Sequence, residues 1–445
     1  MGRLFGTDGV RGVANTELTG ELAYRLGRAA VLCLAERGQT RPDVVVGRDT
    51  RASGEFLEAA LSAGICSAGG DAVLVGVCTT PGVAFLTRIL GAGAGVVISA
   101  SHNPAEYNGI KLFGESGYKL PDEVEDAIEA ATRADDGPRP HGRGVGRVLG
   151  SADSIHRYLA HVESTAQATL DGMRVVVDCA NGAAARLAPP LLRRLGAEVI
   201  PIHDRPDGWN INEGCGANQP DVVALAVADA EADAGVAHDG DADRAMFADH
   251  TGQVVDGDQV LAACALDLHG RGHLEGNAVV TTVMANLGFR LAMADAGIEV
   301  LETRVGDRYV LEEMQRSGAV VGGEQSGHII FLRHATTGDG LLTAVQFLSL
   351  ARRRGVGVSE LGACMRRFPQ VLENVRVGRP DALDGAGPVW EAVREAEQAL
   401  GDRGRVLVRP SGTEPMVRVM VEAPTEEEAR DRALALAGVI RATLA

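Results

Sequence analysis

The sequence predicts an α/β protein in which three related α/β domains are followed by a small α+β domain. Three observations support this fold class. Short β-branched runs alternate with Ala- and Leu-rich stretches through the first three quarters of the 445 residues, a pattern typical of α/β domains. A strand-forming segment recurs at long intervals, and the last part of the chain follows a different pattern.

Polar loops follow three of the predicted strands. In α/β sheets, ligands collect in the loops that follow the strand ends, so these loops are the first candidates for a site. The strands with their loops are 44–46 with 47–51, 96–98 with 99–104, and 175–177 with 178–182.

A glycine that ends a helix and precedes a strand recurs three times, at Gly70, Gly196 and Gly297. The spacings are 126 residues (196 − 70) and 101 residues (297 − 196). Periods this long indicate related domains rather than a solenoid.

Composition also predicts where the domains meet. A Gly-, Pro- and Arg-rich stretch over 133–150 predicts the join between the first two domains. In the tail, strands at 405–408 and 417–422 flank a Gly/Pro turn, and Thr425 with Glu428 forms a capping box that opens a last helix. We therefore expect domains at 1–150, 151–252, 253–368 and 369–445.

The bulk composition argues against several classes of function. The formal charge of −17 at pH 7 argues against nucleic acid or an anionic membrane as partner, because both require an excess of Lys and Arg. The seven cysteines form no C-x-x-C pair, which fits a reducing compartment. No apolar stretch is long enough for a signal peptide or a membrane span, so we expect a cytoplasmic protein.

Lysine is rare and occurs only at Lys111 and Lys119. A partly buried Lys can lose its proton near neutral pH, whereas Arg cannot. We expect Lys111 to be catalytic and Lys119 to be an ordinary surface residue.

Asp239, Asp241 and Asp243 form the densest metal-ligand pattern. Three carboxylates at i, i+2 and i+4 in a loop of small residues can converge on one hard cation, and oxygen ligands of this kind suit Mg²⁺. An EF-hand is excluded because Arg244 and His250 stand where Gly and Glu are required. The alternative is a solvated acidic turn, which leaves the repulsion among three carboxylates without a cation.

Ser101 lies in the loop Ser-Ala-Ser-His-Asn-Pro at 99–104. We expect its hydroxyl on an exposed turn, with Pro104 restricting the backbone. Taken alone, a serine here is most often a turn former. No G-x-S-x-G surrounds it, which excludes the α/β-hydrolase nucleophile, and no G-x-x-x-x-G-K-[ST] occurs, which excludes a P-loop kinase.

Two more loops carry residues suited to binding. The turn at 409–415 combines a glycine, hydroxyl donors and arginines, which predicts a phosphate cradle; a plain hairpin turn is the alternative. The loop at 323–328, Gly-Glu-Gln-Ser-Gly-His, has the residue types that bind sugar hydroxyls. The residues expected to bind in the first loop are Arg409, Ser411, Gly412, Thr413 and Arg418, whereas the second loop taken alone is weak evidence.

Together these motifs resemble the α-D-phosphohexomutase family over essentially the whole chain. Within it, 6–15, 323–331 and 336–344 are most similar to the bacterial branch that acts on glucosamine phosphates. Ala242 is a departure, since the family usually has Gly there. The motifs that carry the resemblance are 6–12, 47–51, 99–104, 239–244, 323–328 and 409–415.

The resemblance implies three similar α/β domains with mixed sheets, plus a small C-terminal domain, around a central cleft. It implies that phospho-Ser101 carries the working phosphate and completes the shell of one Mg²⁺ with the three aspartates. A homodimer is expected by resemblance only. The resemblance implies that the reacting centre is lined by Ser101, Arg11, His102, Lys111 and His328, and that Mg²⁺ is bound by Ser101, Asp239, Asp241 and Asp243. It implies that the sugar hydroxyls are bound by Glu324 and Ser326, and that the phosphate that is not reacting is bound by Arg409, Ser411, Gly412, Thr413 and Arg418.

The implied reaction converts glucosamine 6-phosphate to glucosamine 1-phosphate through a hexose 1,6-bisphosphate, for amino-sugar nucleotide synthesis. Such transfer needs positioning and charge neutralisation. Lys111, with a lowered pKa, or His328 would move the proton. Gln325 and Arg308 are candidates for reading the 2-amino group. The alternatives are a phosphomannomutase or phosphoglucomutase of the same family and, outside enzymes, a sugar-phosphate-binding regulator.

Overall fold

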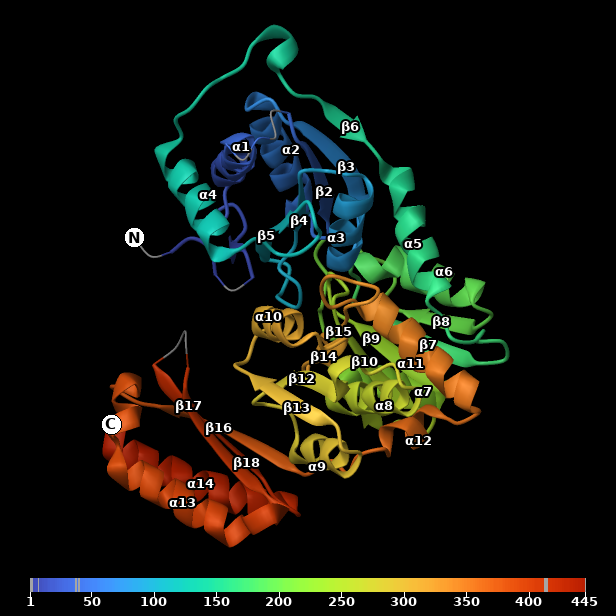
Figure 1. Cartoon of the computed structure of the whole chain (residues 1–445), viewed down its shortest axis with the longest axis vertical. Coiled ribbons are helices and arrows are strands. Elements are labelled where there is room, and N and C mark those ends of the chain that lie inside the picture. Colours follow the sequence, from blue (N-terminus) through green and yellow to red (C-terminus); the bar gives the residue numbers. More distant parts are fainter. Residues whose placement is uncertain (1–2, 7, 37, 39–40, 412–414, 445) are drawn as a thin grey trace. The chain divides into compact units, whose positions relative to one another are not determined.

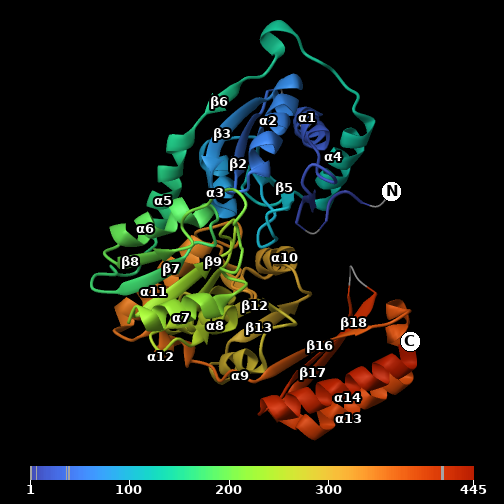
Figure 2. The same cartoon turned by 180° about the vertical axis from the view of Figure 1, so that it is seen from behind.

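The computed structural model describes residues 3–6, 8–36, 38, 41–411 and 415–444. It divides into two compact units, which we call the large unit (Met1–Val283 with Ile298–Ala363) and the small unit (Met284–Gly297 with Cys364–Ala445). Figures 1 and 2 show the chain from opposite sides. Each helix in the described residues is too short or too polar to cross a bilayer.

The first sheet of the large unit is mixed, with the strand order β1-β5-β4-β2-β3-β6. Val44 and Val46 on β2 pack with α1, α2 and α4, whereas Val45 between them packs with α3 on the other face. This alternation follows from the two-residue period of a strand and explains why the β2 segment is apolar throughout. The elements are β1 (Val10–Val13), α1 (Gly20–Glu36), β2 (Asp43–Arg48), α2 (Ser53–Ser67), β3 (Asp71–Val77), α3 (Thr80–Ile89), β4 (Ala94–Ile98), β5 (Tyr107–Gly114), α4 (Asp122–Ala134) and β6 (Val148–Gly150).

The second sheet has the order β11-β10-β9-β7-β8. Its strands β7, β8 and β9 run parallel, and β10 turns back antiparallel to β9. The turn between β9 and β10 carries the three aspartates. The elements are α5 (Ile155–Ser164), β7 (Arg174–Asp178), α6 (Ala188–Arg194), β8 (Glu198–Ile202), α7 (Pro220–Asp229), β9 (Ala234–His238), β10 (Ala245–Asp249) and β11 (Val254–Val255).

The third sheet has the order β13-β12-β14-β15 and is again mixed. The antiparallel turn between β14 and β15 carries the loop at 323–328. The elements are α8 (Gly257–Gly270), β12 (Ala278–Thr282), β13 (Glu299–Thr303), α10 (Asp307–Ser317), β14 (Val321–Gly323), β15 (Ile329–Phe331), α11 (Gly340–Arg354) and α12 (Val358–Gly362).

The small unit is an antiparallel sheet, β16-β18-β17, packed against two helices. The predicted tail strands and last helix are present, and Thr425 Oγ1 accepts from Glu428 N at 3.2 Å. The segment of α9, which comes from the middle of the chain, belongs to this unit. The elements are α9 (Leu287–Asp295), β16 (Gln370–Arg376), α13 (Gly387–Leu400), β17 (Arg405–Pro410), β18 (Met416–Glu422) and α14 (Glu426–Leu444).

These four sheets confirm the predicted fold class: three α/β domains with mixed sheets and a small α+β domain. The stretch at 133–150 is not purely a linker, because its end forms β6 and extends the first sheet beside β3. The strand β16 and helix α13 were not predicted.

Candidate active site

Ser101 lies just after β4, against the loop of the three aspartates. Its Oγ donates to Asp239 Oδ2 at 2.6 Å. Gly240 allows this approach, since a Cβ there would stand 2.5 Å from Ser101 O. The prediction of an exposed turn is wrong: Ser101 is only 1% exposed, because the acidic loop of the next domain covers it.

The aspartate loop is buried and highly charged. Asp239, Asp241 and Asp243 each offer an oxygen, and these oxygens lie within 4.8 Å of one another. Burial, together with Asp243 and Asp241, raises the pKa of Asp239 well above its usual value. Oδ1 of Asp241 and Oδ1 of Asp243 are buried without a hydrogen-bond partner. Buried carboxylate oxygens of this kind require a cation, so the residues fit the predicted Mg²⁺.

Lys111, on β5, reaches this loop from the first sheet. Its Nζ lies 2.8 Å from Asp241 Oδ2 and 3.1 Å from Asp8 Oδ2. Burial alone would lower the pKa of Lys111, but Asp241, Asp8 and Asp243 outweigh it and raise the pKa. The predicted lowering of this pKa is therefore wrong, and Lys111 is a cation in this arrangement.

Two more of the predicted residues lie at the loop that carries Ser101. His102 Nδ1 lies 3.4 Å from Ser101 Oγ, and burial, helped by Arg244 and Arg11, lowers the pKa of His102 to about 4. The imidazole is therefore neutral near pH 7. Arg11, on β1, contacts Asp8 and lies 3.5 Å from Asn103 Oδ1.

The loop at 323–328 lies beside the aspartate loop, since Ala245 N donates to Gly327 O at 3.0 Å. His328 Nδ1 is 3.6 Å from Asp243 Oδ2, so the structure brings His328 to the same centre as Ser101. Glu324 and Ser326 are half-buried in this loop, and Glu324 Oε1 accepts from Gly306 N at 3.2 Å.

Lys119 is not the surface residue that was predicted. Its side chain is 12% exposed, and Nζ lies 2.7 Å from Asp8 Oδ1 and 2.6 Å from Asp307 Oδ2. Asp307 begins α10 and also lies 3.8 Å from His328 Nε2. A signal for this contact was present in the sequence: Lys119 is one of only two lysines in an Arg-rich chain.

The predicted phosphate cradle belongs to the small unit. Arg409 on β17 stands directly opposite Arg418 on β18, and burial, together with Arg418, lowers the pKa of Arg409. Ser411 N donates to Met416 O at 2.9 Å. The remaining predicted residues, Gly412 and Thr413, lie outside the described residues.

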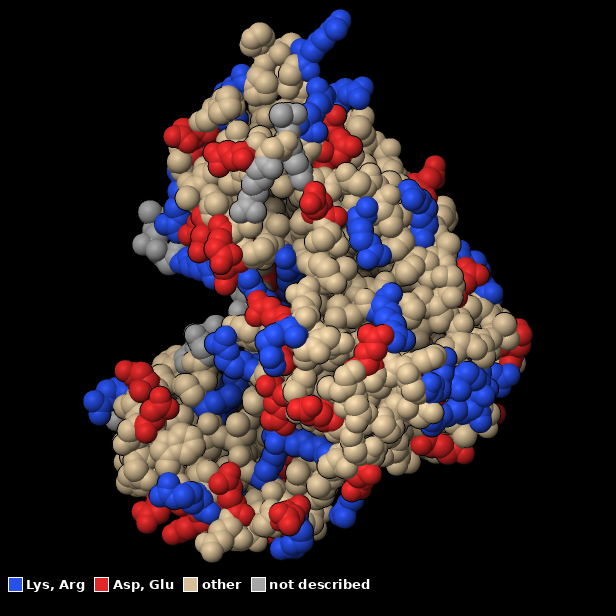
Figure 3. All heavy atoms as spheres, viewed as in Figure 1, with Lys and Arg blue, Asp and Glu red and all other residues tan. Residues whose placement is uncertain are grey.

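The surface charge is mixed despite the net charge of −17. On the face drawn in Figure 3, acidic and basic side chains intermingle.

Comparison with known proteins agrees with this arrangement. Models of the phosphoglucomutase/phosphomannomutase family match the chain with alpha/beta/alpha domain I at 2–139, domain II at 156–252, domain III at 256–368 and the C-terminal domain at 372–439.

One curated relative is the phosphoglucosamine mutase of Moorella thermoacetica, which is 58% identical over 430 residues, covering 96% of this chain and 97% of the relative. Among solved structures, a phosphoglucomutase/phosphomannomutase family protein from Burkholderia thailandensis has a TM-score of 0.82 at 24% identity, over 98% of both chains. The N-acetylphosphoglucosamine mutase of Aspergillus fumigatus, in complex with GlcNAc-6P and magnesium, has a TM-score of 0.68 at 18% identity, over 99% of this chain and 96% of its own. The predicted family is confirmed: the chain belongs to the phosphoglucomutase/phosphomannomutase family, and it is a mutase.

Proposed function

We propose that this mutase interconverts glucosamine 6-phosphate and glucosamine 1-phosphate through phospho-Ser101 and a 1,6-bisphosphate intermediate. The observation that carries the proposal is Ser101 Oγ at 2.6 Å from Asp239, inside a loop of three buried carboxylates. The choice of sugar is supported by the name of the relative that is 58% identical. A cytoplasmic homodimer that serves amino-sugar and cell-wall precursor synthesis is part of the proposal, by resemblance.

Asp239, Asp241 and Asp243 would hold one Mg²⁺, together with a phosphate oxygen on Ser101. The two unpartnered Oδ1 atoms support this assignment, and the solved Aspergillus relative is a complex with magnesium. When bound, the ion would neutralise the negative charge that develops on the phosphate oxygens during phosphoryl transfer.

Arg11, Lys111 and His102 would act on the reacting phosphate and hydroxyl. Lys111 and Arg11 bring positive charge beside Ser101 and orient the transferring phosphoryl group by hydrogen bonds. Lys111, as a cation, can donate a proton to the oxygen that leaves, and His328 remains the competing proton carrier. The neutral imidazole of His102, beside Ser101 Oγ, can hold this oxygen in place.

Arg409 and Arg418 would bind the phosphate that is not reacting. They stand directly opposite each other on neighbouring strands, where like charges repel and destabilise the sheet. A phosphate dianion between them relieves this repulsion and accepts bidentate hydrogen bonds. In this proposal Arg409 and Arg418 accept the phosphate at either end of the sugar bisphosphate.

A combined mass and activity measurement tests the proposal. Intact-mass analysis of the purified protein is expected to show one phosphate that maps to Ser101, and Ser101→Ala is expected to lack both the phosphate and the turnover. Ser116→Ala serves as the matched control. Coupled assays with glucosamine, glucose and mannose 6-phosphates are expected to favour glucosamine.

The outcomes separate the alternatives. Preference for mannose or glucose would place the chain in the other branches of the family. A Ser101→Ala protein that still turns over would remove the phosphoserine role. An unphosphorylated protein that binds sugar phosphate without turnover would favour a regulator.

The acidic loop has its own test. Asp241→Asn is expected to weaken Mg²⁺ binding at least 100-fold, because even a change in residues behind the ligands costs about 10–100-fold. Titration calorimetry with MgCl₂ measures this, and Asp229→Asn at the end of α7 is the control. Unchanged Mg²⁺ affinity would remove Asp241 from the ligand set.

A further inference from the structure

The motif at 47–51 has no role in the proposed reaction, yet it is deeply buried. Asp49 and Arg51 are both 0% exposed. Burying a guanidinium and a carboxylate costs several kcal/mol per ion unless hydrogen bonds compensate. The partners of these two side chains therefore indicate what the motif does.

Arg51 connects this motif to the Ser101 loop. Its Nη1 contacts Asp49, and its Nη2 donates to Ser101 O at 3.2 Å and to Asn103 O at 2.5 Å. Asp49 accepts from Ser99 Oγ at 2.5 Å, and Ser99 Oγ accepts from Ser101 N at 2.9 Å. Both the N–H and the C=O of Ser101 are thus fixed by one buried network.

Asn212 holds the same two carbonyls from the second α/β domain. Its Nδ2 donates to Ser101 O at 2.9 Å and to Asn103 O at 3.0 Å. The amide and the guanidinium therefore converge on the loop from two different domains. None of these bonds involves the Ser101 hydroxyl, which remains directed at Asp239.

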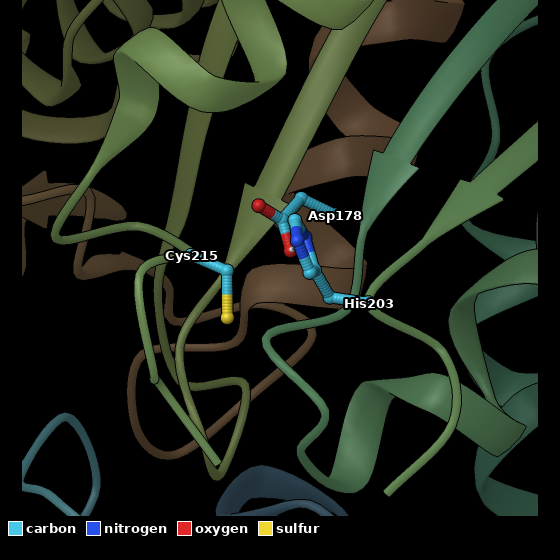
Figure 4. A group of neighbouring side chains, drawn as sticks. All are labelled: Asp178, His203 and Cys215. Carbon is cyan, nitrogen blue, oxygen red and sulfur yellow. Dashed lines mark hydrogen bonds and ion pairs between the residues drawn. The ribbon is translucent and has the colours of Figure 1, made fainter. Parts of the chain in front are cut away.

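The loop that carries Asn212 is anchored in turn by Asp178, at the end of β7. Asp178 accepts from His203 Nδ1 at 3.1 Å and from Gly216 N at 2.8 Å, at the two ends of the segment that contains Asn212. In Figure 4 the imidazole of His203 lies against this carboxylate, and Cys215 Sγ lies within 4.8 Å of an atom of each. Asn212 N also donates to Ala180 O at 2.9 Å.

Ser101 needs this support because its backbone is left-handed, with φ of +51°. This conformation costs a residue other than glycine roughly 1–2 kcal/mol. A serine with unpaired backbone groups would relax out of it and turn Oγ away from Asp239. Glycine, which adopts the conformation without cost, has no hydroxyl to carry a phosphate.

We propose that Arg51 and Asn212 are positioning residues: they hold Ser101 in its left-handed conformation from two domains and so aim Oγ at the aspartate loop. This inference rests on the proposed role of Ser101 as the phosphate carrier. Because both side chains reach the Ser101 loop through its main-chain carbonyls, they act on the transfer step and not on the sugar. A misplacement of about 1 Å at a reacting atom can lower a rate by about 100-fold.

The test compares kcat with KM in matched variants. Asn212 has φ of +59°, so Asn212→Gly removes the amide without straining the backbone. Arg51→Lys keeps the charge and removes the forked donors. We expect kcat to fall about 10- to 100-fold in each variant, while KM for the sugar phosphate stays within about twofold of the wild-type value. The fall in kcat is expected to be equal for every sugar phosphate that the enzyme converts. The double variant is expected to lose less than the product of the single losses, because both side chains hold the same carbonyls.

Arg48→Lys is the control for Arg51→Lys. Arg48 lies in the same motif, but its side chain pairs with Glu55 and Glu58, so we expect an unchanged kcat. Thermal unfolding measures any general loss of structure. A loss of stability with an unchanged kcat in both Asn212→Gly and Arg51→Lys would overturn the positioning role.

The same samples separate this inference from the proposed function. If the wild-type protein carries phosphate on Ser101 and the variants match its kcat, only the positioning role fails. If the wild type carries no phosphate on Ser101 and Ser101→Ala retains turnover, the proposed function fails first.

Discussion

Lys119 shows what burial does to a single charged residue. Its ammonium lies between Asp8 of the first domain and Asp307 of the third. Burial alone would lower the pKa of Lys119, but Asp307 and Asp8 outweigh it and raise the pKa. The ion triad therefore joins two domains of the large unit beside the reacting centre, because Asp8 also contacts Lys111.

Replacing Lys119 is expected to destabilise the large unit. Lys119→Met leaves two half-buried carboxylates without their shared cation, a type of change that costs about 1–3 kcal/mol. Urea unfolding followed by circular dichroism measures this loss, and Lys119→Arg is expected to restore part of it. Arg316→Met, which breaks an exposed pair on α10, is the control with no measurable change. Equal stability of Lys119→Met and wild type would contradict a structural role for the triad.

At the scale of elements, the N-cap of α11 is Asp339, a buried carboxylate with a raised pKa. Asp339 caps the helix by accepting from Leu342 N at 2.9 Å, and both its oxygens accept from the hydroxyl of Tyr158 at 2.9 Å. Asp339 is 2% exposed. Burial raises its pKa to about 6 from the usual 3.8, against the pull of these hydrogen bonds.

This shift predicts a pH dependence with a definite sign. A carboxyl with a raised folded-state pKa contributes stability that is fully present below 3.8 and is lost as the pH rises through about 6. When the pH falls from 7.5 to 5, the free energy of unfolding of the wild type is therefore expected to rise by about 1.4 kcal/mol relative to that of Asp339→Asn. The size follows because pH 5 is roughly one unit below the folded-state pKa, and one unit corresponds to about 1.4 kcal/mol. Urea unfolding of both proteins at both pH values measures the difference. A larger wild-type advantage at pH 7.5 would contradict the assignment.

At the scale of the whole molecule, the small unit is discontinuous in sequence. Glu422 on β18 joins its two parts: it accepts from Leu287 N at 2.8 Å, from Asn286 Nδ2 at 3.3 Å and from Arg405 Nε at 2.8 Å. Glu422 is 0% exposed. Asn286 also exchanges hydrogen bonds with Phe368, so Glu422 is the buried carboxylate among several contacts that hold the α9 segment.

Calorimetry can test this arrangement in the full chain. Two units are expected to give two unfolding transitions, and Glu422→Gln is expected to lower only the one that belongs to the small unit. Removing one partner of a buried ion pair costs about 3 kcal/mol. Glu426→Gln, at an exposed pair on α14, is the control. A parallel shift of both transitions would contradict a local role for Glu422.

The sequence alone was sufficient for the fold class, and it pointed to most of the residues that the structure brings together in the candidate site. The periods of the apolar residues predicted the strands and the α/β pattern, because side chains must alternate across a sheet wherever a core is buried. The Asp239–Asp241–Asp243 spacing predicted a metal loop, because adjacent carboxylates repel one another unless a cation is present. These are local rules, and a sequence displays them directly.

Only the tertiary structure decided which distant residues meet. In the folded chain, Ser101 is buried under a loop that lies 138 positions away in the sequence. The pKa of Lys111 is raised by Asp241 and Asp8. The segment of α9 belongs to the same unit as the tail of the chain. The tertiary structure also showed that Arg51 and Asn212 share the same carbonyls. Burial, pKa and hydrogen-bond partners depend on contacts between remote segments, and no local spacing encodes those contacts.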